Sequence, residues 1–286
     1  MQEIAPQVFI ERDYPGVTLG LIHWEGGIIL IDVPFRPDDI RLWRASMSEF
    51  SDKPERLVIN LDDHYDRTLG LRQIDWTVVG HEKLPLLLKD RPINIRPQGN
   101  ETGAEWELHS APGNIRWSPP EISFSDKLEI HLGEKDVVLQ SRPGPTPAAI
   151  WAHLPGQKVI FVGDTVMPGA VPFLANADLN QWVETLKLLL QPSFRSYTIV
   201  SGRNGLVTPV EIKNQIKILE KINQLLEKTA EKQLRVEDVQ KTASKILKIC
   251  DVANQEEVQQ LQRARWGLVQ YLKRTTGAQL EQPQFF

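Results

Sequence analysis

The chain has 286 residues, enough for one large domain or for a domain with an extension. Hydrophobic residues make up 41% of it and charged residues 24%, which excludes a disordered chain. The net charge of −4 excludes a general electrostatic attraction to nucleic acid, so no nucleic-acid partner is expected.

The single cysteine, Cys250, excludes an intramolecular disulfide and favours an intracellular, cytoplasmic location. Its neighbours are typical of a helix end, which predicts a packed thiol rather than a nucleophile. The N-terminus has no basic segment followed by an apolar core, so no secretory signal is expected. No apolar run approaches the roughly 20 residues that span a bilayer, so no membrane segment is expected.

The first third of the chain alternates strand and helix patterns, which favours an α/β arrangement. A β-meander is predicted for residues 7–33, because alternating apolar residues are interrupted by turn signals such as Glu25-Gly26-Gly27. The next predicted elements are a helix at 37–50, a strand at 57–59, a short helix at 69–74, a strand at 76–80 and a helix from 81.

The stretch from Leu57 to Gly70, LVINLDDHYDRTLG, is the most informative part of the sequence. An apolar strand pattern runs directly into a cluster of charged and ionisable side chains. Such a cluster at the end of a rigid, buried element is typical of a functional site. The clustered residues are Asp62, Asp63, His64, Asp66 and Arg67.

Residues 91–120 are rich in proline and glycine and carry Trp106, Trp117 and His109. A loop of this length in a compact domain is usually a lid or a binding loop. A tryptophan-anchored surface wrap explains the same composition, and the sequence does not separate these two interpretations.

The pattern of a meander, a strand ending in aspartate and a helix is then repeated. Residues 121–163 are predicted to form the second meander, 178–190 a helix and 197–200 the last strand. Beyond Pro209 three apolar stripes at helical spacing predict helices that close over the fold or pair with a second subunit.

The spacing Asp62-x-His64-x-Asp66-Arg67 after an apolar strand resembles the His-x-His-x-Asp-His motif of the metallo-β-lactamase superfamily. The early strand GGIILIDVP, which ends in Asp32, is also similar to that family. The resemblance implies a four-layer αββα sandwich, with mixed sheets face to face and helices on both outer sides. We assign residues 1–208 to this domain and 209–286 to a C-terminal helical extension. Asp32 is expected behind the site.

In the resembled family two metal ions share a pocket at the strand ends, and several of the implied ligand positions are changed in this chain. The two histidines of His-x-His correspond to Asp62 and His64, and the Asp-His pair corresponds to Asp66 and Arg67. Three later ligand positions correspond to Pro145, Asp164 and Arg203.

These replacements oppose metal binding. Proline has no side-chain ligand, and arginine stays protonated and cannot coordinate a metal. We therefore expect no dinuclear metal centre and no cofactor. If one divalent ion binds weakly, its ligands are Asp62, His64 and Asp164, which favour manganese, iron or magnesium over a zinc pair. Arg67 and Arg203 are instead predicted to form an ion-pair network with Asp66 and Asp164.

Three functional hypotheses follow. In the first, the protein is a pseudo-hydrolase that binds a small anionic ligand at Arg67 and Arg203, or a protein partner or second copy through its C-terminal helices. In the second, it hydrolyses esters, lactones or thioesters at a mononuclear or metal-free site, where His64 acts as general base. In the third, it is a structural subunit.

Overall fold

The computed structural model describes residues 1–48, 50, 55–89, 91, 101–109, 117–133, 135–230 and 236–277. Its first sheet has seven strands in the order β1 to β7. Strands β1 to β4 pair antiparallel, whereas β4 to β7 pair parallel. The strands are β1 (Gln2–Ala5), β2 (Val8–Glu11), β3 (Leu19–Trp24), β4 (Gly27–Ile31), β5 (Glu55–Ile59), β6 (Thr77–His81) and β7 (Ile122–Phe124).

The second sheet has six strands in the order β13-β12-β11-β10-β9-β8. All its neighbours pair antiparallel except β11 and β12, which are parallel. The strands are β8 (Lys127–Leu132), β9 (Lys135–Ser141), β10 (Ile150–Leu154), β11 (Val159–Phe161), β12 (Thr198–Ser201) and β13 (Gly205–Val207).

Side chains alternate between the two faces of a sheet along each strand, and at β4 both faces are apolar. In β4, Ile29 and Ile31 pack into the core between the two sheets, together with Phe161 of β11. Ile28 and Leu30 of the same strand pack on the opposite side. Both faces of β4 are therefore covered, which explains its continuous apolar sequence.

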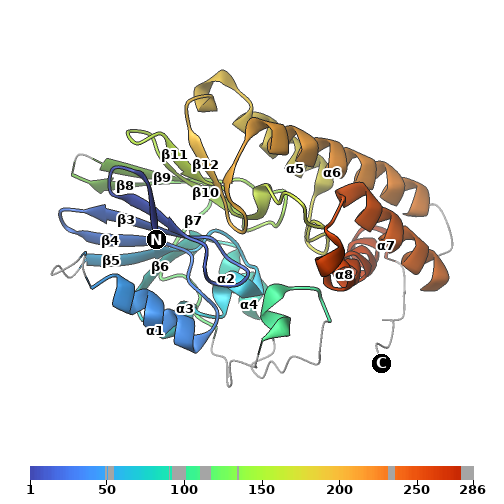
Figure 1. The fold of residues 1–286 in the computed structure, drawn as a ribbon, viewed down its shortest axis with the longest axis horizontal. Helices are drawn as coiled ribbons and strands as arrows, with labels where there is room; N and C mark the ends of the chain where they lie inside the picture. The colour runs from blue at the N-terminus through green and yellow to red at the C-terminus, as the bar shows by residue number, and fades with distance from the viewer. Residues whose placement is uncertain are drawn as a thin grey trace.

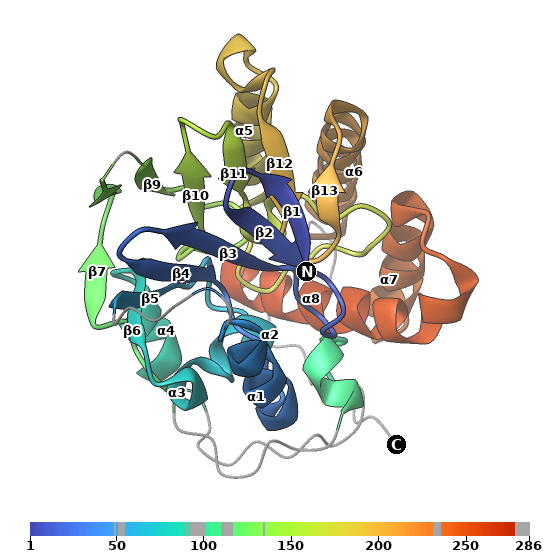
Figure 2. The same ribbon diagram turned by 60° about the vertical axis from the view of Figure 1, so that its left-hand side comes forward.

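Helices cover the two outer faces, as Figures 1 and 2 show. Helix α1 (Pro37–Ser46) buries Ile40 and Trp43 against the outside of the first sheet, beside the short helix α3 (Leu71–Ile74). Helices α5 (Leu179–Leu189) and α6 (Pro209–Ala230) lie outside the second sheet. The predicted four-layer αββα sandwich is confirmed. The other short helices are α2 (Tyr65–Thr68), α4 (Leu84–Lys89), and the 3₁₀ turns η1 (Glu105–Leu108), η2 (Gly163–Thr165), η3 (Pro192–Phe194) and η4 (Asn254–Glu256).

The C-terminal segment forms the three predicted helices: α6, α7 (Val236–Cys250) and α8 (Glu257–Thr276). Their apolar stripes are buried in the same core cluster as α5, since Leu186, Leu219, Ile246 and Leu268 all belong to it. The helices therefore close over the sandwich with their apolar faces. Helix α6 begins at the predicted boundary, Pro209, while the division into two domains stays a prediction. Among the described helices, none is both long and apolar enough to cross a membrane.

Two predicted strand assignments were wrong. Residues 122–124 belong to the first sheet as β7, parallel to β6, and not to the second meander. Residues 205–207 form a further strand, β13, after the predicted last strand. The alternation of Ile122 and Phe124 indicates a strand but not the sheet that it joins. The sequence Gly205-Leu206-Val207 has no alternating polar residue, so it was not recognised as a strand. Residues 281–286, predicted from the sequence to be either a loose tail or one docked by its two phenylalanines, lie outside the described residues.

Cys250 ends α7 and is buried, as predicted for a packed thiol. Burial raises its pKa to about 12, so the reactive thiolate is scarce at neutral pH. We expect the native protein to react with a thiol reagent such as Ellman's reagent much more slowly than the urea-unfolded chain at pH 8. Equal rates would show that the thiol is accessible.

Candidate functional site

The polar cluster predicted at the end of β5 lies at the edge where the carboxyl ends of the parallel strands meet. The chain after β5 is fixed on both sides, because Leu61 donates its backbone N–H to Asp32 and accepts one from Ile150 of the second sheet, each over 2.9 Å. Helix α2 then begins at Tyr65, and its first turn carries Asp66 and Arg67 into the interior. The site is thus positioned by both sheets.

Arg67 is at the centre of this site and is fully buried. Its guanidinium contacts three carboxylates. Nη1 donates to Asp32 Oδ2 over 2.7 Å, Nε lies 3.0 Å from Asp62 Oδ1, and Nη2 donates to Asp164 Oδ1. Nη1 also donates to the carbonyl of Gly202 over 3.4 Å. A buried cation of this kind needs such partners, because burial without them costs several kcal/mol.

Arg203 forms the second half of the network. Its Nε lies 2.9 and 3.0 Å from the two oxygens of Asp164, and its Nη1 donates to Asp66 Oδ2 over 2.6 Å. Asp66 accepts the backbone N–H of Trp106 with its other oxygen over 2.9 Å. Asp164 therefore bridges the two guanidinium groups, and Asp66 joins the network to the loop that contains Trp106.

His64 lies between two of the same carboxylates. Its Nδ1 is 3.3 Å from Asp62 Oδ1 and 3.2 Å from Asp164 Oδ2. The ring contacts Phe173, with 4.3 Å between the ring centroids. The side chain is 14% exposed, so it lies at the border between the network and the pocket described below.

The pKa shifts follow from burial and ion pairing. Burial opposes ionisation of Asp62 and Asp164, but the guanidinium groups and His64 hold the pKa of each carboxyl below its ordinary value. Burial lowers the pKa of His64, but Asp62 and Asp164 outweigh this effect, so its pKa lies above the ordinary value. Burial raises the pKa of Asp32 to about 6, against the influence of Arg67.

The structure brings together all six residues singled out from the sequence: Asp62, His64, Asp66, Arg67, Asp164 and Arg203. The structure adds one carboxylate to the predicted network. Asp66 pairs with Arg203, and the third carboxylate on Arg67 is Asp32, which was expected only behind the site. Nothing in the sequence indicated that Phe173 contacts the site, and the turn that contains Gly202 was only a weak indication that Gly202 does.

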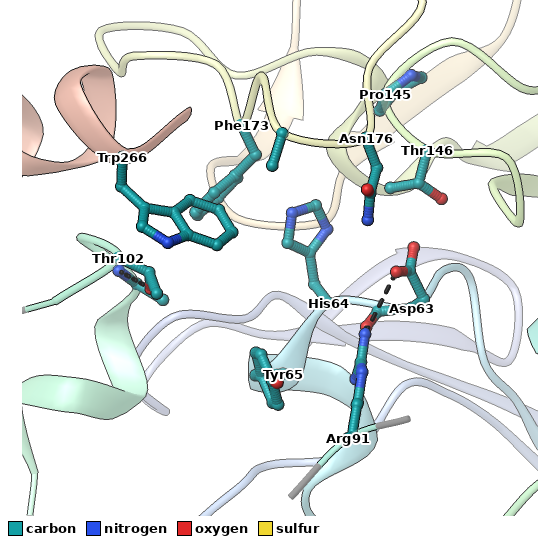
Figure 3. A pocket seen from close by; sticks show the side chains of 12 residues that line it. Asp63, His64, Tyr65, Arg91, Thr102, Pro145, Thr146, Phe173, Asn176 and Trp266 are labelled. Carbon is teal, nitrogen blue, oxygen red and sulfur yellow. Dashed lines mark hydrogen bonds and ion pairs between the residues drawn. The ribbon is translucent and has the colours of Figure 1, made fainter. Parts of the chain in front are cut away.

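A pocket of about 70 Å³ opens beside His64. Figure 3 shows His64 in its centre, with Trp266 and Thr102 on one side and Thr146 and Asn176 on the other. Most of the lining is apolar or aromatic. The twelve lining residues are Asp63, His64, Tyr65, Arg91, Thr102, Ala104, Pro145, Thr146, Phe173, Ala175, Asn176 and Trp266.

Two distant segments complete this pocket. In α8, Arg263 donates Nε and Nη2 to the carbonyl of Gly103 over 2.9 and 2.8 Å, and Trp266 reaches the pocket wall. The described part of the predicted loop, 101–109, has Trp106 buried against Tyr65. This part of the loop is anchored by a buried tryptophan, and it contributes Thr102 and Ala104 to the pocket wall. Its role as a lid or binding loop stays a prediction.

A pair of metal ions, which the resemblance implies, does not fit these residues. Ligand atoms of Asp62, His64 and Asp164 lie within 4.8 Å of one another, which is a possible set for one ion. Oδ1 of Asp62 and both oxygens of Asp164 are, however, already engaged by guanidinium groups. Structural and catalytic zinc sites use three or four protein ligands, mostly histidine or cysteine, and this set contains only one histidine.

Replacing Arg203 by alanine should destabilise the protein by about 3 kcal/mol, because Asp66 and Asp164 lose a buried partner. The midpoint of urea denaturation at pH 7 measures this loss. Arg195→Ala, at an exposed arginine, is the matched control and should change the midpoint little. An unchanged midpoint for Arg203→Ala would argue against the network.

The sequence is similar to that of known proteins. Acyl-coenzyme A thioesterase MBLAC2 of Bos taurus and of Homo sapiens is 24% identical over 135 residues, 45% of this chain and 48% of the relative. The match thus spans about half the length of these curated relatives. Residues 20–195, more than half of the chain, match the family model described as the metallo-beta-lactamase superfamily.

Two solved structures are similar in fold. The sec-alkylsulfatase Pisa1 from Pseudomonas sp. has a TM-score of 0.70 and 14% identity, over 96% of this chain and 50% of that one. A metallo-beta-lactamase from Pontibacter korlensis has a TM-score of 0.60 and 16% identity, over 77% of this chain and 97% of that one. The first match must include most of the C-terminal helices to reach its coverage. The chain belongs to the metallo-beta-lactamase superfamily.

Proposed function

We propose that this protein binds a small molecule in the pocket beside His64 and does not carry out dinuclear metal hydrolysis. The observation that carries the proposal is the Arg67 guanidinium, which contacts Asp32, Asp62 and Asp164 from a fully buried position. It holds a fixed positive charge at the carboxylates that would otherwise bind cations.

Charge balance supports this proposal. Four carboxylates face two guanidinium groups and an imidazole with a raised pKa, so the cluster is close to neutral without a metal ion. A divalent ion at Asp62 and Asp164 would lie beside two arginines that cannot lose their protons. Displacing either guanidinium would break buried ion pairs, which typically costs about 3–5 kcal/mol per pair.

The pocket is a better ligand site than the arginines themselves. The Arg67 guanidinium is buried and directed at carboxylates, and Arg203 is paired with Asp66 and Asp164. An anion between them would compete with four carboxylates. The apolar stripes of the C-terminal helices are already buried in the chain's own core, so a protein partner or second copy on those stripes gains no support.

Metal content tests the proposal. The protein is expressed with added zinc, purified without chelator and measured by mass spectrometry for zinc, manganese and iron. We expect well below one equivalent of each, and a melting temperature that EDTA does not change. One or two equivalents, with a lower melting temperature after chelation, would contradict the proposal.

A second candidate is thioester hydrolysis at a rearranged site. It is favoured by the similarity to acyl-coenzyme A thioesterases and by the position of His64 on an apolar pocket wall. Release of free thiol from short-chain and medium-chain acyl-coenzyme A tests it. Thioester hydrolysis would be favoured over binding alone if His64→Gln abolishes turnover and the control His131→Gln, at an exposed histidine, retains it.

A further inference from the structure

Asp63 lies in the pocket wall and carries a buried carboxylate oxygen that has no partner within the described part of the chain. The residue is 3% exposed. Arg91 donates Nη2 to its Oδ2 over 3.2 Å, whereas Oδ1 has no hydrogen-bond partner among the described residues. A buried polar atom without a partner is costly, typically by about 1–3 kcal/mol, so such an atom in a pocket wall indicates where a ligand binds.

Arg91 cannot turn to bond the free oxygen. Its Nη1 donates to Thr68 Oγ1 over 3.0 Å, and its Nη2 also donates to the backbone carbonyl of Asp63. Its guanidinium is stacked 4.3 Å from the centroid of the Tyr65 ring. The salt bridge is therefore fixed from three sides, and Asp63 Oδ1 is left without a hydrogen-bond partner among the described residues.

The free oxygen lies on the polar side of the pocket. Figure 3 shows the Asp63 carboxylate directed toward Thr146 and Asn176, while Phe173 and Trp266 form the opposite, apolar side. Thr146 Oγ1 accepts the backbone N–H of Ala148 over 3.1 Å and keeps its own proton to donate. A ligand that fits both sides has one polar group and one apolar part.

The volume and the charges restrict the ligand further. A pocket of about 70 Å³ restricts the ligand to a small molecule, since one water needs at least about 10–15 Å³. An ionised carboxylate only accepts hydrogen bonds, so it disfavours an anion and requires a donor. The guanidinium groups of Arg203 and Arg263 lie 4.7 and 4.2 Å from the centroid of Phe173, which disfavours a cation there.

We infer that the pocket binds a small neutral molecule with a hydroxyl or amide N–H donor on an apolar ring or short chain. The donor bonds to Asp63 Oδ1, and the apolar part packs on Phe173 and Trp266. This inference names the ligand class for the binding function proposed above and rests on that function.

Four probes of similar size test the inference: phenol, fluorobenzene, benzoate and benzylammonium. Binding is followed by NMR titration on the full chain, through the indole N–H of Trp266, which Trp266→Phe identifies. We expect phenol to bind about tenfold more tightly than fluorobenzene, because only phenol donates a hydrogen bond to the charged oxygen. Benzoate and benzylammonium should bind more weakly than phenol.

Asp63→Asn removes the charge and keeps the shape. We expect phenol affinity to fall about fivefold, because hydrogen bonds to charged groups are roughly twice as strong as neutral ones. Fluorobenzene affinity should not change. Asp126→Asn, at an exposed aspartate, is the matched control and should bind all probes as the unchanged protein does.

The outcomes separate the two proposals. Equal binding of phenol and fluorobenzene, or tightest binding of an ion, overturns the ligand class but leaves the binding function. Binding of no probe at Trp266 overturns the inference and removes support from the binding function. Stoichiometric metal, measured separately, contradicts the metal-independent function whatever the probes do.

Discussion

Replacing Arg67 by methionine is expected to destabilise the protein by about 3–5 kcal/mol at pH 7, because it removes the guanidinium that three buried carboxylates share. Methionine keeps much of the side-chain length but removes the charge. Asp32, Asp62 and Asp164 are then left as buried carboxylates with one guanidinium fewer. The total free energy of unfolding is typically about 5–15 kcal/mol, so this loss is a large part of it. We therefore expect the variant to unfold at a much lower urea concentration.

The pH dependence separates this explanation from simple loss of packing. In the unchanged protein Asp62 and Asp164 have lowered pKa values. Their contribution to stability is therefore present above the ordinary pKa of 3.8 and is lost as the pH falls through the folded-state values. In Arg67→Met the buried carboxyls lack the guanidinium and favour the protonated form. Ionising them as the pH rises therefore lowers the free energy of unfolding of the variant.

The stability difference between the two proteins should thus grow from pH 4 to pH 7, as urea denaturation at each pH would measure. The control is Arg41→Met, since Arg41 is 74% exposed and its ion pair with Asp38 is a surface pair. Its effect should stay below about 1 kcal/mol. A small, pH-independent effect of Arg67→Met would show that the carboxylates do not depend on the guanidinium.

Replacing Gly202 by alanine is expected to destabilise the protein by about 3 kcal/mol or more. A Cβ atom at this position would meet both Nη atoms of Arg67 and would lie 2.7 Å from its Cζ. Such overpacking usually costs about 1–3 kcal/mol, and at Gly202 it also displaces the central guanidinium from its carboxylates. The glycine is required because the backbone passes directly against Arg67.

Gly156→Ala is the matched control, because a Cβ there would have no atom within 4 Å. We expect its unfolding free energy to stay within about 0.5 kcal/mol of the unchanged protein. Thermal or urea denaturation of both variants measures the difference. Equal stability of the two alanine variants would mean that Arg67 can move away from Gly202 at little cost.

Most strands and helices were predictable because burial imposes periodicity, whereas their four-layer arrangement was implied by the family resemblance. The continuous apolar run in β4 and the stripes of α1, α5 and α6 each reflect a face that packs on a neighbour. The sheet to which β7 belongs was not predictable, because its short pattern is compatible with either sheet. The strand β13 was missed because Gly205 begins it and its three residues show no alternation.

The candidate site was predictable in its residues but not in its pairing. Asp62, His64, Asp66 and Arg67 are close in sequence and follow one strand, so their clustering was visible. The partner of each guanidinium depends on side-chain direction in a four-residue helix, and spacing alone does not set that direction. The pocket was not predictable, since Arg91, Phe173 and Trp266 come from three distant segments.

The replacement of metal ions by guanidinium groups is tested most directly by a crystal structure grown with excess zinc, with anomalous diffraction data collected at the zinc absorption edge. We predict no anomalous peak among Asp62, His64 and Asp164, and an Arg67 guanidinium within hydrogen-bond distance of Asp32, Asp62 and Asp164. A peak at full occupancy among those three residues, with Arg67 displaced from them, would contradict the replacement.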